Sequence, residues 1–153
     1  MVGRWFKRLS SSFKRSPEVG LGRPAGDKPW RLLIVEDDRT VREVLAAMLM
    51  NMGHTVVACE ERAAALAVLE RESFDLALIG LSLPGIGGWQ LIETIKGQWL
   101  RMPVVVVTDL AEPAKPSSRQ ALINGFLQKP FGYEQLNRIL SSVLPLGRTE
   151  GLM

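Results

Sequence analysis

Short apolar runs alternate with segments of helical periodicity between Trp30 and about Leu144. The apolar runs predict five strands, at residues 31–35, 55–59, 76–79, 104–107 and 126–128. Most of these runs are apolar at consecutive positions, which is typical of parallel strands that helices cover on both faces. The pattern therefore predicts an α/β fold built on a doubly wound, five-stranded parallel sheet.

Apolar positions three and four residues apart predict helices between the strands, over residues 41–49, 63–69 and 91–95, with a last helix over 136–143. Asp38 or Thr40 can cap the first helix by accepting hydrogen bonds from its free amide groups. The fourth connection differs, because Pro113 and Pro116 cannot donate to a helix ladder. We therefore expect its helix to begin only near Ser117 and to be short.

The 153 residues, of which 46% are hydrophobic, suit one domain with a core of ordinary size. No apolar run approaches the length of a membrane-spanning helix, and the N-terminus lacks the apolar stretch of a signal peptide. The single cysteine, Cys59, excludes an internal disulfide and fits a buried thiol. These features lead us to expect a cytoplasmic protein.

Charge divides the chain into two parts. Residues 1–29 contain seven basic and two acidic residues, whereas the remainder contains twelve basic and fourteen acidic ones. We therefore expect a basic arm with a flexible linker at residues 1–29, a folded domain at 30–144 and a tail at 145–153. No DNA-reading module follows the folded part, so the basic arm predicts no specific nucleic-acid binding.

A helical projection of residues 1–15 separates two kinds of side chain. One side is apolar and the other is cationic, as seen in Trp5, Phe6, Leu9 and Phe13 against Arg4, Lys7 and Arg8. Such a helix can lie on an anionic inner-membrane surface or fill the groove of a partner protein. A segment this short is marginal alone in water, so a plain disordered tail is a third interpretation.

Distinctive residues follow four of the predicted strands at one edge of the sheet. They are Glu36-Asp37-Asp38, Gly80, Thr108-Asp109 and Lys129-Pro130. In an open α/β sheet, ligands bind beyond the carboxyl ends of the strands, so these residues are expected to form one pocket. The loop after Gly80 reads Leu81-Ser82-Leu83-Pro84-Gly85.

This order of an acidic cluster, an LxLPG loop, a threonine and a Lys-Pro pair resembles the receiver domains of response regulators, a CheY-like family with the flavodoxin-like (βα)5 fold. The resemblance implies that Glu36 and Asp37 are the acidic pair that holds Mg2+, and that Lys129 offsets phosphoryl charge. It implies that Thr108 bonds a phosphoryl oxygen and moves, and that Phe126 is the aromatic residue near the fifth strand that moves with the threonine. It also implies a signalling module rather than an enzyme, with a histidine kinase, response regulator or output protein as partner.

Gly80 departs from the family pattern, because the corresponding residue is the aspartate that accepts the phosphoryl group. The glycine removes the nucleophile and one metal ligand. We therefore expect no catalytic residue, no required cofactor, and only weak or vestigial Mg2+ binding at Glu36 and Asp37. Asp75 lies at the far end of the strand and Ser82 is a neutral hydroxyl without a base, so neither replaces the aspartate.

Asp109 is a second departure, because receivers usually have a small residue there that leaves room for the phosphoryl group. The chain also lacks a few residues that receivers commonly carry before Phe126, which predicts an altered face at the fifth strand. We expect Lys129 to pair with Asp109 or Asp37 and to hold the pocket in one state. The alternative is that the charged residues are solvent-exposed remnants.

The sequence thus favours a stand-alone pseudo-receiver of two-component phosphorelay signalling that acts by phosphorylation-independent protein–protein interaction. Two alternatives stay open. One is a response regulator that accepts phosphate on a non-standard residue. The other is a signalling adaptor that residues 1–15 hold at the inner membrane surface. The identity of the partner and the oligomeric state are not predicted.

Overall fold

The structure, a computed structural model, describes residues 29–83, 87–110 and 118–144. Within these residues lies one five-stranded parallel sheet with the strand order β2-β1-β3-β4-β5. The strands are β1 (Arg31–Val35), β2 (Thr55–Cys59), β3 (Leu76–Gly80), β4 (Val104–Thr108) and β5 (Gly125–Gln128). The prediction of a doubly wound, five-stranded parallel sheet is confirmed, and three of the strands are one residue longer than predicted.

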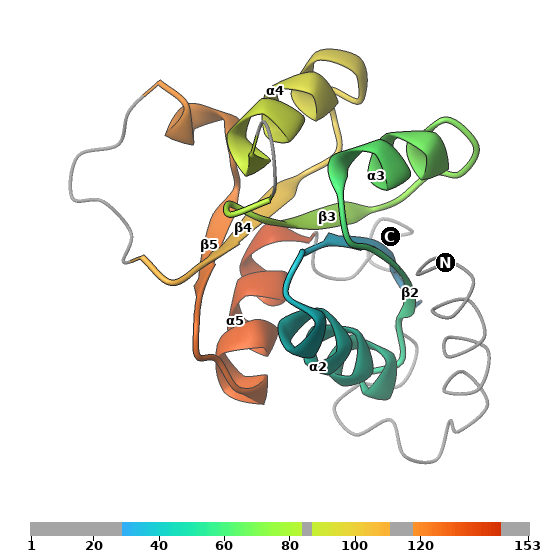
Figure 1. Ribbon diagram of the computed structural model, residues 1–153. Coiled ribbons are helices and arrows are strands. Elements are labelled where there is room, and N and C mark those ends of the chain that lie inside the picture. Colours follow the sequence, from blue (N-terminus) through green and yellow to red (C-terminus); the bar gives the residue numbers. More distant parts are fainter. Residues whose placement is uncertain (1–28, 84–86, 111–117, 145–153) are drawn as a thin grey trace, which may run out of the picture.

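Helices cover both faces of the sheet (Figure 1). One face carries α2 (Arg39–Asn51) and α5 (Tyr133–Val143), and the other carries α3 (Arg62–Leu69) and α4 (Gly88–Gln98). The N-cap of α2 is Asp38, whose side chain accepts a 3.0 Å hydrogen bond from the Val41 amide. Of the two predicted caps, the structure therefore selects Asp38 over Thr40.

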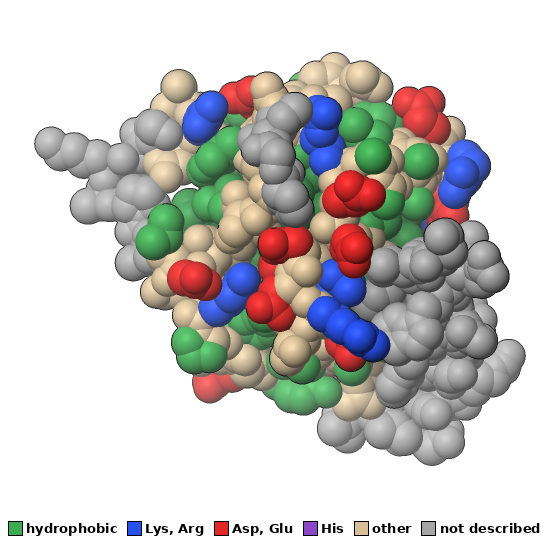
Figure 2. Space-filling view, viewed as in Figure 1, with side chains coloured by type: hydrophobic (Ala, Val, Ile, Leu, Met, Phe, Trp, Pro, Cys, Tyr) green, Lys and Arg blue, Asp and Glu red, His purple; other side chains and the backbone are tan. Residues whose placement is uncertain are grey.

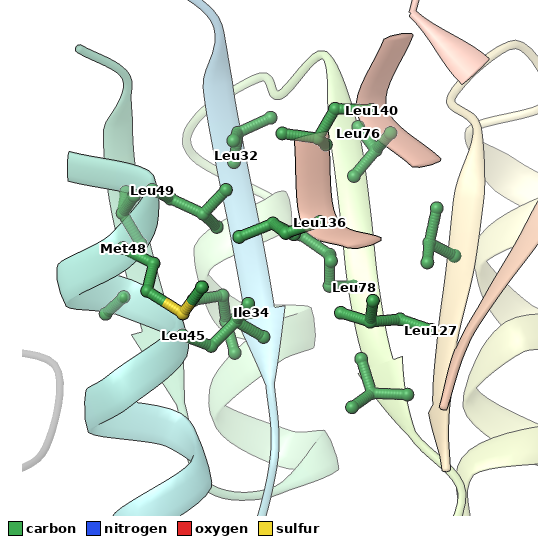
Figure 3. Packing of buried hydrophobic residues seen from close by; sticks show 14 of the residues in the cluster. Leu32, Ile34, Leu45, Met48, Leu49, Leu76, Leu78, Leu127, Leu136 and Leu140 are labelled. Carbon is green, nitrogen blue, oxygen red and sulfur yellow. The ribbon is translucent and has the colours of Figure 1, made fainter. Parts of the chain in front are cut away.

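The strands bury both faces because successive side chains point to opposite sides of the sheet. Leu32 and Ile34 of β1 pack toward α2 and α5, whereas Leu33 and Val35 pack toward α3 and α4. Figure 3 shows the first of these layers, in which sheet residues meet Leu45, Leu49, Leu136 and Leu140 of the helices. Each fully buried side chain of this kind contributes roughly 1.5–3 kcal/mol, so the two layers hold the strand ends in place.

The connection between β4 and β5 has no α-helix in its described part. It contains instead the 3-10 helix η2 (Gln120–Leu122), directly before β5. Asn124 then joins β4, with its side chain accepting from the Val104 amide at 2.9 Å and its own amide donating to the Val104 carbonyl at 2.7 Å. The prediction of an α-helix is therefore wrong for residues 118–124, where the structure has a 3-10 helix.

The predicted arm with its linker covers residues 1–29 and the predicted tail covers 145–153; apart from Pro29, these residues lie outside the described ones. Their boundaries with the folded domain therefore stay predictions. Among the helices that the structure describes, none is long and apolar enough to cross a membrane.

Candidate functional site

The carboxyl ends of β1, β3, β4 and β5 bring the predicted pocket residues to one edge of the sheet. Glu36 follows β1, Gly80 ends β3, Thr108 ends β4 and Lys129 follows β5. The strand order reverses direction between β1 and β3, which is the position at which open α/β sheets bind ligands. Residues far apart in the sequence therefore meet where the sequence predicts a pocket.

Glu36 turns its side chain into the molecule, and only 1% of the residue is exposed. Its Oε2 accepts a 3.0 Å hydrogen bond from the Asp38 amide, whereas its Oε1 has no hydrogen-bond partner among the described residues. Burial raises the pKa of the Glu36 carboxyl, against the opposing effects of the Asp38 amide and the Lys129 ammonium. The interpretation of solvent-exposed remnants is therefore wrong for Glu36.

The Glu36 carboxylate fills the space that a side chain at Gly80 would need. A Cβ placed on Gly80 would lie 2.6 Å from Glu36 Oε1 and 3.2 Å from Glu36 Cδ. Carbon and oxygen atoms that are not bonded to each other do not approach as closely as the first of these distances. A side chain at Gly80 would therefore require the end of the Glu36 side chain to move.

Lys129 is the cation that faces this carboxylate. Its Nζ lies 3.6 Å from Glu36 Oε2 and 3.9 Å from Asp109 Oδ1. The Asp109 side chain is 79% exposed, so solvent weakens that contact, whereas the Glu36 side chain is 2% exposed. The predicted pairing with Asp109 is thus present but secondary. Asp37, the other predicted partner, is exposed and is not one of the carboxylates that Lys129 reaches.

Thr108 and Phe126 lie on one face of neighbouring strands. Thr108 is paired in register with Gln128, two positions after Phe126, so both side chains point toward the layer covered by α3 and α4. Thr108 is buried, and its Oγ1 accepts a 3.1 Å hydrogen bond from the Leu110 amide. Phe126 is half-buried among the apolar residues of the same layer.

Residues 32–141 match the response regulator receiver domain family. The chain belongs to this family. It is 38% identical over 103 residues to the response regulator protein FleR of Pseudomonas aeruginosa, a match that covers 66% of this chain and 22% of FleR. The first three curated relatives are matched over 22%, 40% and 51% of their lengths, so the chain spans about half of them or less. Receiver domains are signalling modules of two-component systems.

Two solved receiver structures are similar to this one. The chemotaxis response regulator CheY4 of Vibrio cholerae has a TM-score of 0.71 and 25% identity, covering 76% of this chain and all (100%) of that chain. The receiver domain of the sensor histidine kinase PA1611 from Pseudomonas aeruginosa has a TM-score of 0.66 and 26% identity, covering 76% and 98%. These neighbours place the fold among CheY-like, flavodoxin-like receivers.

The PA1611 receiver domain coordinates a magnesium ion in its active-site cleft. The pocket of this receiver does not fit such an ion, because Mg2+ demands an octahedral set of oxygen ligands. The described residues contain no group of three or more His, Cys, Asp or Glu side chains that could hold a metal. Gly80 also supplies no carboxylate at the end of β3, where the family pattern has a metal ligand.

Arg42 is a pocket residue that the sequence reasoning missed. It is 4% exposed, and its Nη1 donates to the carbonyl oxygens of Glu36 at 2.8 Å and Asp37 at 3.3 Å. Its Nη2 lies 3.6 Å from Glu60 Oε1. Arg42 thus holds the loop after β1 from behind and sets the direction in which Glu36 leaves the strand. The sequence signal for a buried Arg42 was its position next to apolar residues in the helical pattern of α2.

The surface of the receiver has two further features. Figure 2 shows acidic and basic side chains next to one another across the middle of one face. A groove of about 620 Å3 runs between β5 and α5, with a lining that includes Phe126, Lys129, Arg138 and Ile139. Lys129 therefore borders both the pocket and this groove.

Proposed function

We propose that this receiver domain is a pseudo-receiver, a signalling module that acts by protein–protein interaction without being phosphorylated. The observation that carries the proposal is the buried Glu36 carboxylate, whose Oε1 lies 2.6 Å from the place of a Cβ on Gly80. At the end of β3 the pocket has Gly80 in place of a nucleophile, and the end of the Glu36 side chain would have to shift to make room for one. The receiver fold then serves through its surface.

Other side chains near the pocket are poor acceptors. Ser82 is exposed and has a neutral hydroxyl, which needs a base to become a nucleophile. Thr108 Oγ1 is buried and accepts from the Leu110 amide. Asp75 precedes β3, and its Oδ2 accepts a 2.8 Å hydrogen bond from the amide of Arg31, the first residue of β1. Its carboxylate is therefore at the opposite edge of the sheet from the pocket.

The partner class follows from the family. Similar sequences occur in a response regulator, FleR, and in a sensor protein, GacS, which match this chain at 38% and 30% identity. A histidine kinase, another response regulator or an output protein is therefore the proposed partner, and the proposed compartment is the cytoplasm. The amphipathic arm at residues 1–15 would add a contact with an anionic membrane or with the same partner.

Phosphate transfer from a small acyl phosphate in the presence of Mg2+ tests the proposal. The full chain should show no added phosphate by intact-mass spectrometry after incubation. The Gly80→Asp variant is the matched control, because it returns a carboxylate to the end of β3 and should gain phosphate. Phosphate on the wild-type chain at a stoichiometric level would overturn the proposal in favour of a working response regulator.

A second experiment separates the arm from the folded domain. The full chain and residues 30–153 are each sedimented with vesicles of neutral lipid and with vesicles that contain anionic lipid. Sedimentation of the full chain alone, and only with anionic vesicles, supports an arm that contacts membranes. Equal recovery of both chains in the supernatant overturns the membrane role and leaves the interaction module in place.

A further inference from the structure

Lys129 and Glu36 form a salt bridge although their strands are not neighbours. The sheet order places β3 and β4 between β1 and β5, and neighbouring strands lie about 4.8 Å apart. A separation of 3.6 Å between Nζ and Oε2 therefore requires both side chains to extend toward the middle of the sheet. They meet beyond the carboxyl end of β3, where Gly80 carries no side chain to keep them apart.

We infer that Lys129 is the resident cation of this pocket, and that it balances the Glu36 carboxylate in place of a divalent metal ion. The inference deepens the proposed function, because it makes the pocket independent of Mg2+ as well as of phosphate. The PA1611 receiver domain, which coordinates magnesium in its cleft, differs in this respect.

The surroundings of Glu36 leave little for a metal ion to bind. Its Oε2 already contacts the Asp38 amide at 3.0 Å and Lys129 Nζ at 3.6 Å. Its Oε1 faces Gly80 and is shielded from solvent. Behind the loop, the Arg42 guanidinium donates to the Glu36 carbonyl at 2.8 Å and fixes the start of the loop. With Gly80 in place of a carboxylate at the end of β3, a divalent ion would lack one oxygen ligand and would have to share Glu36 Oε2 with the ammonium.

Titration with MgCl2 at constant ionic strength, followed by amide NMR of the full chain, tests the inference. The signals of Glu36, Asp37 and Gly80 should show no saturable shift up to about 10 mM, which exceeds the millimolar Kd of weak oxygen-ligand sites. The Gly80→Asp variant, with a third carboxylate, should show a saturable shift and so proves that the measurement detects binding. Saturable shifts at these three signals in the wild type would overturn the inference.

Thermal unfolding of Lys129→Met tests whether the ammonium balances Glu36. The variant should lose about 5 °C or more in Tm, because removal of one partner leaves a buried carboxylate without its cation. Lys96→Met is the matched control, since Lys96 is half-buried but donates to the Met102 carbonyl at 2.9 Å rather than to a carboxylate. Adding Glu36→Gln should restore most of the loss in Lys129→Met and none in Lys96→Met.

The inference fails if Lys129→Met is as stable as Lys96→Met, or if Glu36→Gln does not restore the lost Tm. These outcomes are distinct from a failure of the proposed function. Saturable Mg2+ binding without phosphate transfer would reject the inference that Lys129 replaces the metal ion, and would leave the proposed interaction module standing. Phosphate transfer to the wild type without a saturable Mg2+ shift at the pocket would reject the proposed interaction module, and would leave the inference about Lys129 standing.

Discussion

The Glu36 carboxylate and Gly80 share one volume at the end of β3. Glu36 Oε1 lies 2.6 Å from the point at which a Cβ on Gly80 would stand, and Glu36 itself is 1% exposed. The missing side chain of this receiver is therefore not an empty space. A carboxylate from the neighbouring strand end occupies it, and that relationship makes the effects of substituting either residue depend on the other.

Gly80→Ala should destabilise the protein, although alanine in a strand is usually favoured over glycine by roughly 0.5–1 kcal/mol. The added methyl group crowds Glu36 Oε1, and overpacking of this kind costs about 1–3 kcal/mol. We expect a net loss of about 1 kcal/mol in the free energy of unfolding, measured with urea. In a Glu36→Ala background the same substitution should be neutral or stabilising.

Gly97→Ala is the control for this cycle, because a Cβ on Gly97 meets nothing within 4 Å and should stabilise α4 by up to about 1 kcal/mol. Equal effects of Gly80→Ala with and without Glu36 would contradict the shared volume. The cycle is read at one pH, since Glu36 is ionisable.

Glu36→Gln should become more stable relative to the wild type as the pH rises. Burial raises the folded-state pKa of Glu36 above its ordinary value of 4.5, so the folded protein binds this proton more tightly than the unfolded chain does. The resulting contribution to the free energy of unfolding is present below the unfolded-state pKa and is lost as the pH rises through the folded-state pKa. Glutamine does not ionise, so the Glu36→Gln variant does not lose stability in this way. Urea unfolding between about pH 4 and pH 8 should show a stability difference that grows and then levels off; a difference that is constant or shrinks contradicts it.

The sequence predicts the sheet well because each strand carries its own signal. Runs such as Val104 to Val107 are apolar at every position, and strands of that composition are buried on both faces whatever surrounds them. The connection before β5 is harder to predict, because its end is fixed by two hydrogen bonds between Asn124 and Val104. These bonds join residues twenty positions apart, so no local sequence pattern predicts them.

The composition of the pocket is also readable from the sequence, but its pairing is not. Gly80, Glu36 and Lys129 are identified by their place after a strand. The side-chain directions at the sheet edge decide which carboxylate Lys129 contacts. These directions depend on the space at Gly80 and on the hydrogen bond from Arg42 to the Glu36 carbonyl. Tertiary contacts thus selected Glu36 where the sequence favoured Asp109 or Asp37.

Arg42→Met should lower the free energy of unfolding by about 2–3 kcal/mol, because a charged donor to two carbonyl groups is lost from a site with a 5% exposed side chain. Arg39→Met is the control in the same helix. Its side chain is 78% exposed and pairs with Glu43 four residues later, so its loss should be about 0.5 kcal/mol or less. Similar losses for the two variants in urea unfolding would show that Arg42 does not hold the loop.

Cys59 reports on the same loop, since its carbonyl accepts a 3.0 Å hydrogen bond from the Glu36 amide. Burial raises the pKa of the Cys59 thiol to about 11. At pH 8 the thiolate is therefore only about one thousandth of the population, and the residue is 1% exposed. A thiol reagent should react with the folded protein at least about 100-fold more slowly than with the protein in urea.

Arg42→Met should raise the reaction rate of Cys59 in the folded protein, because a loosened loop exposes the end of β2, whereas Arg39→Met should leave that rate unchanged. A folded-state rate within tenfold of the unfolded rate, or equal rates in the two arginine variants, would show that the pocket loop and the end of β2 open independently of Arg42.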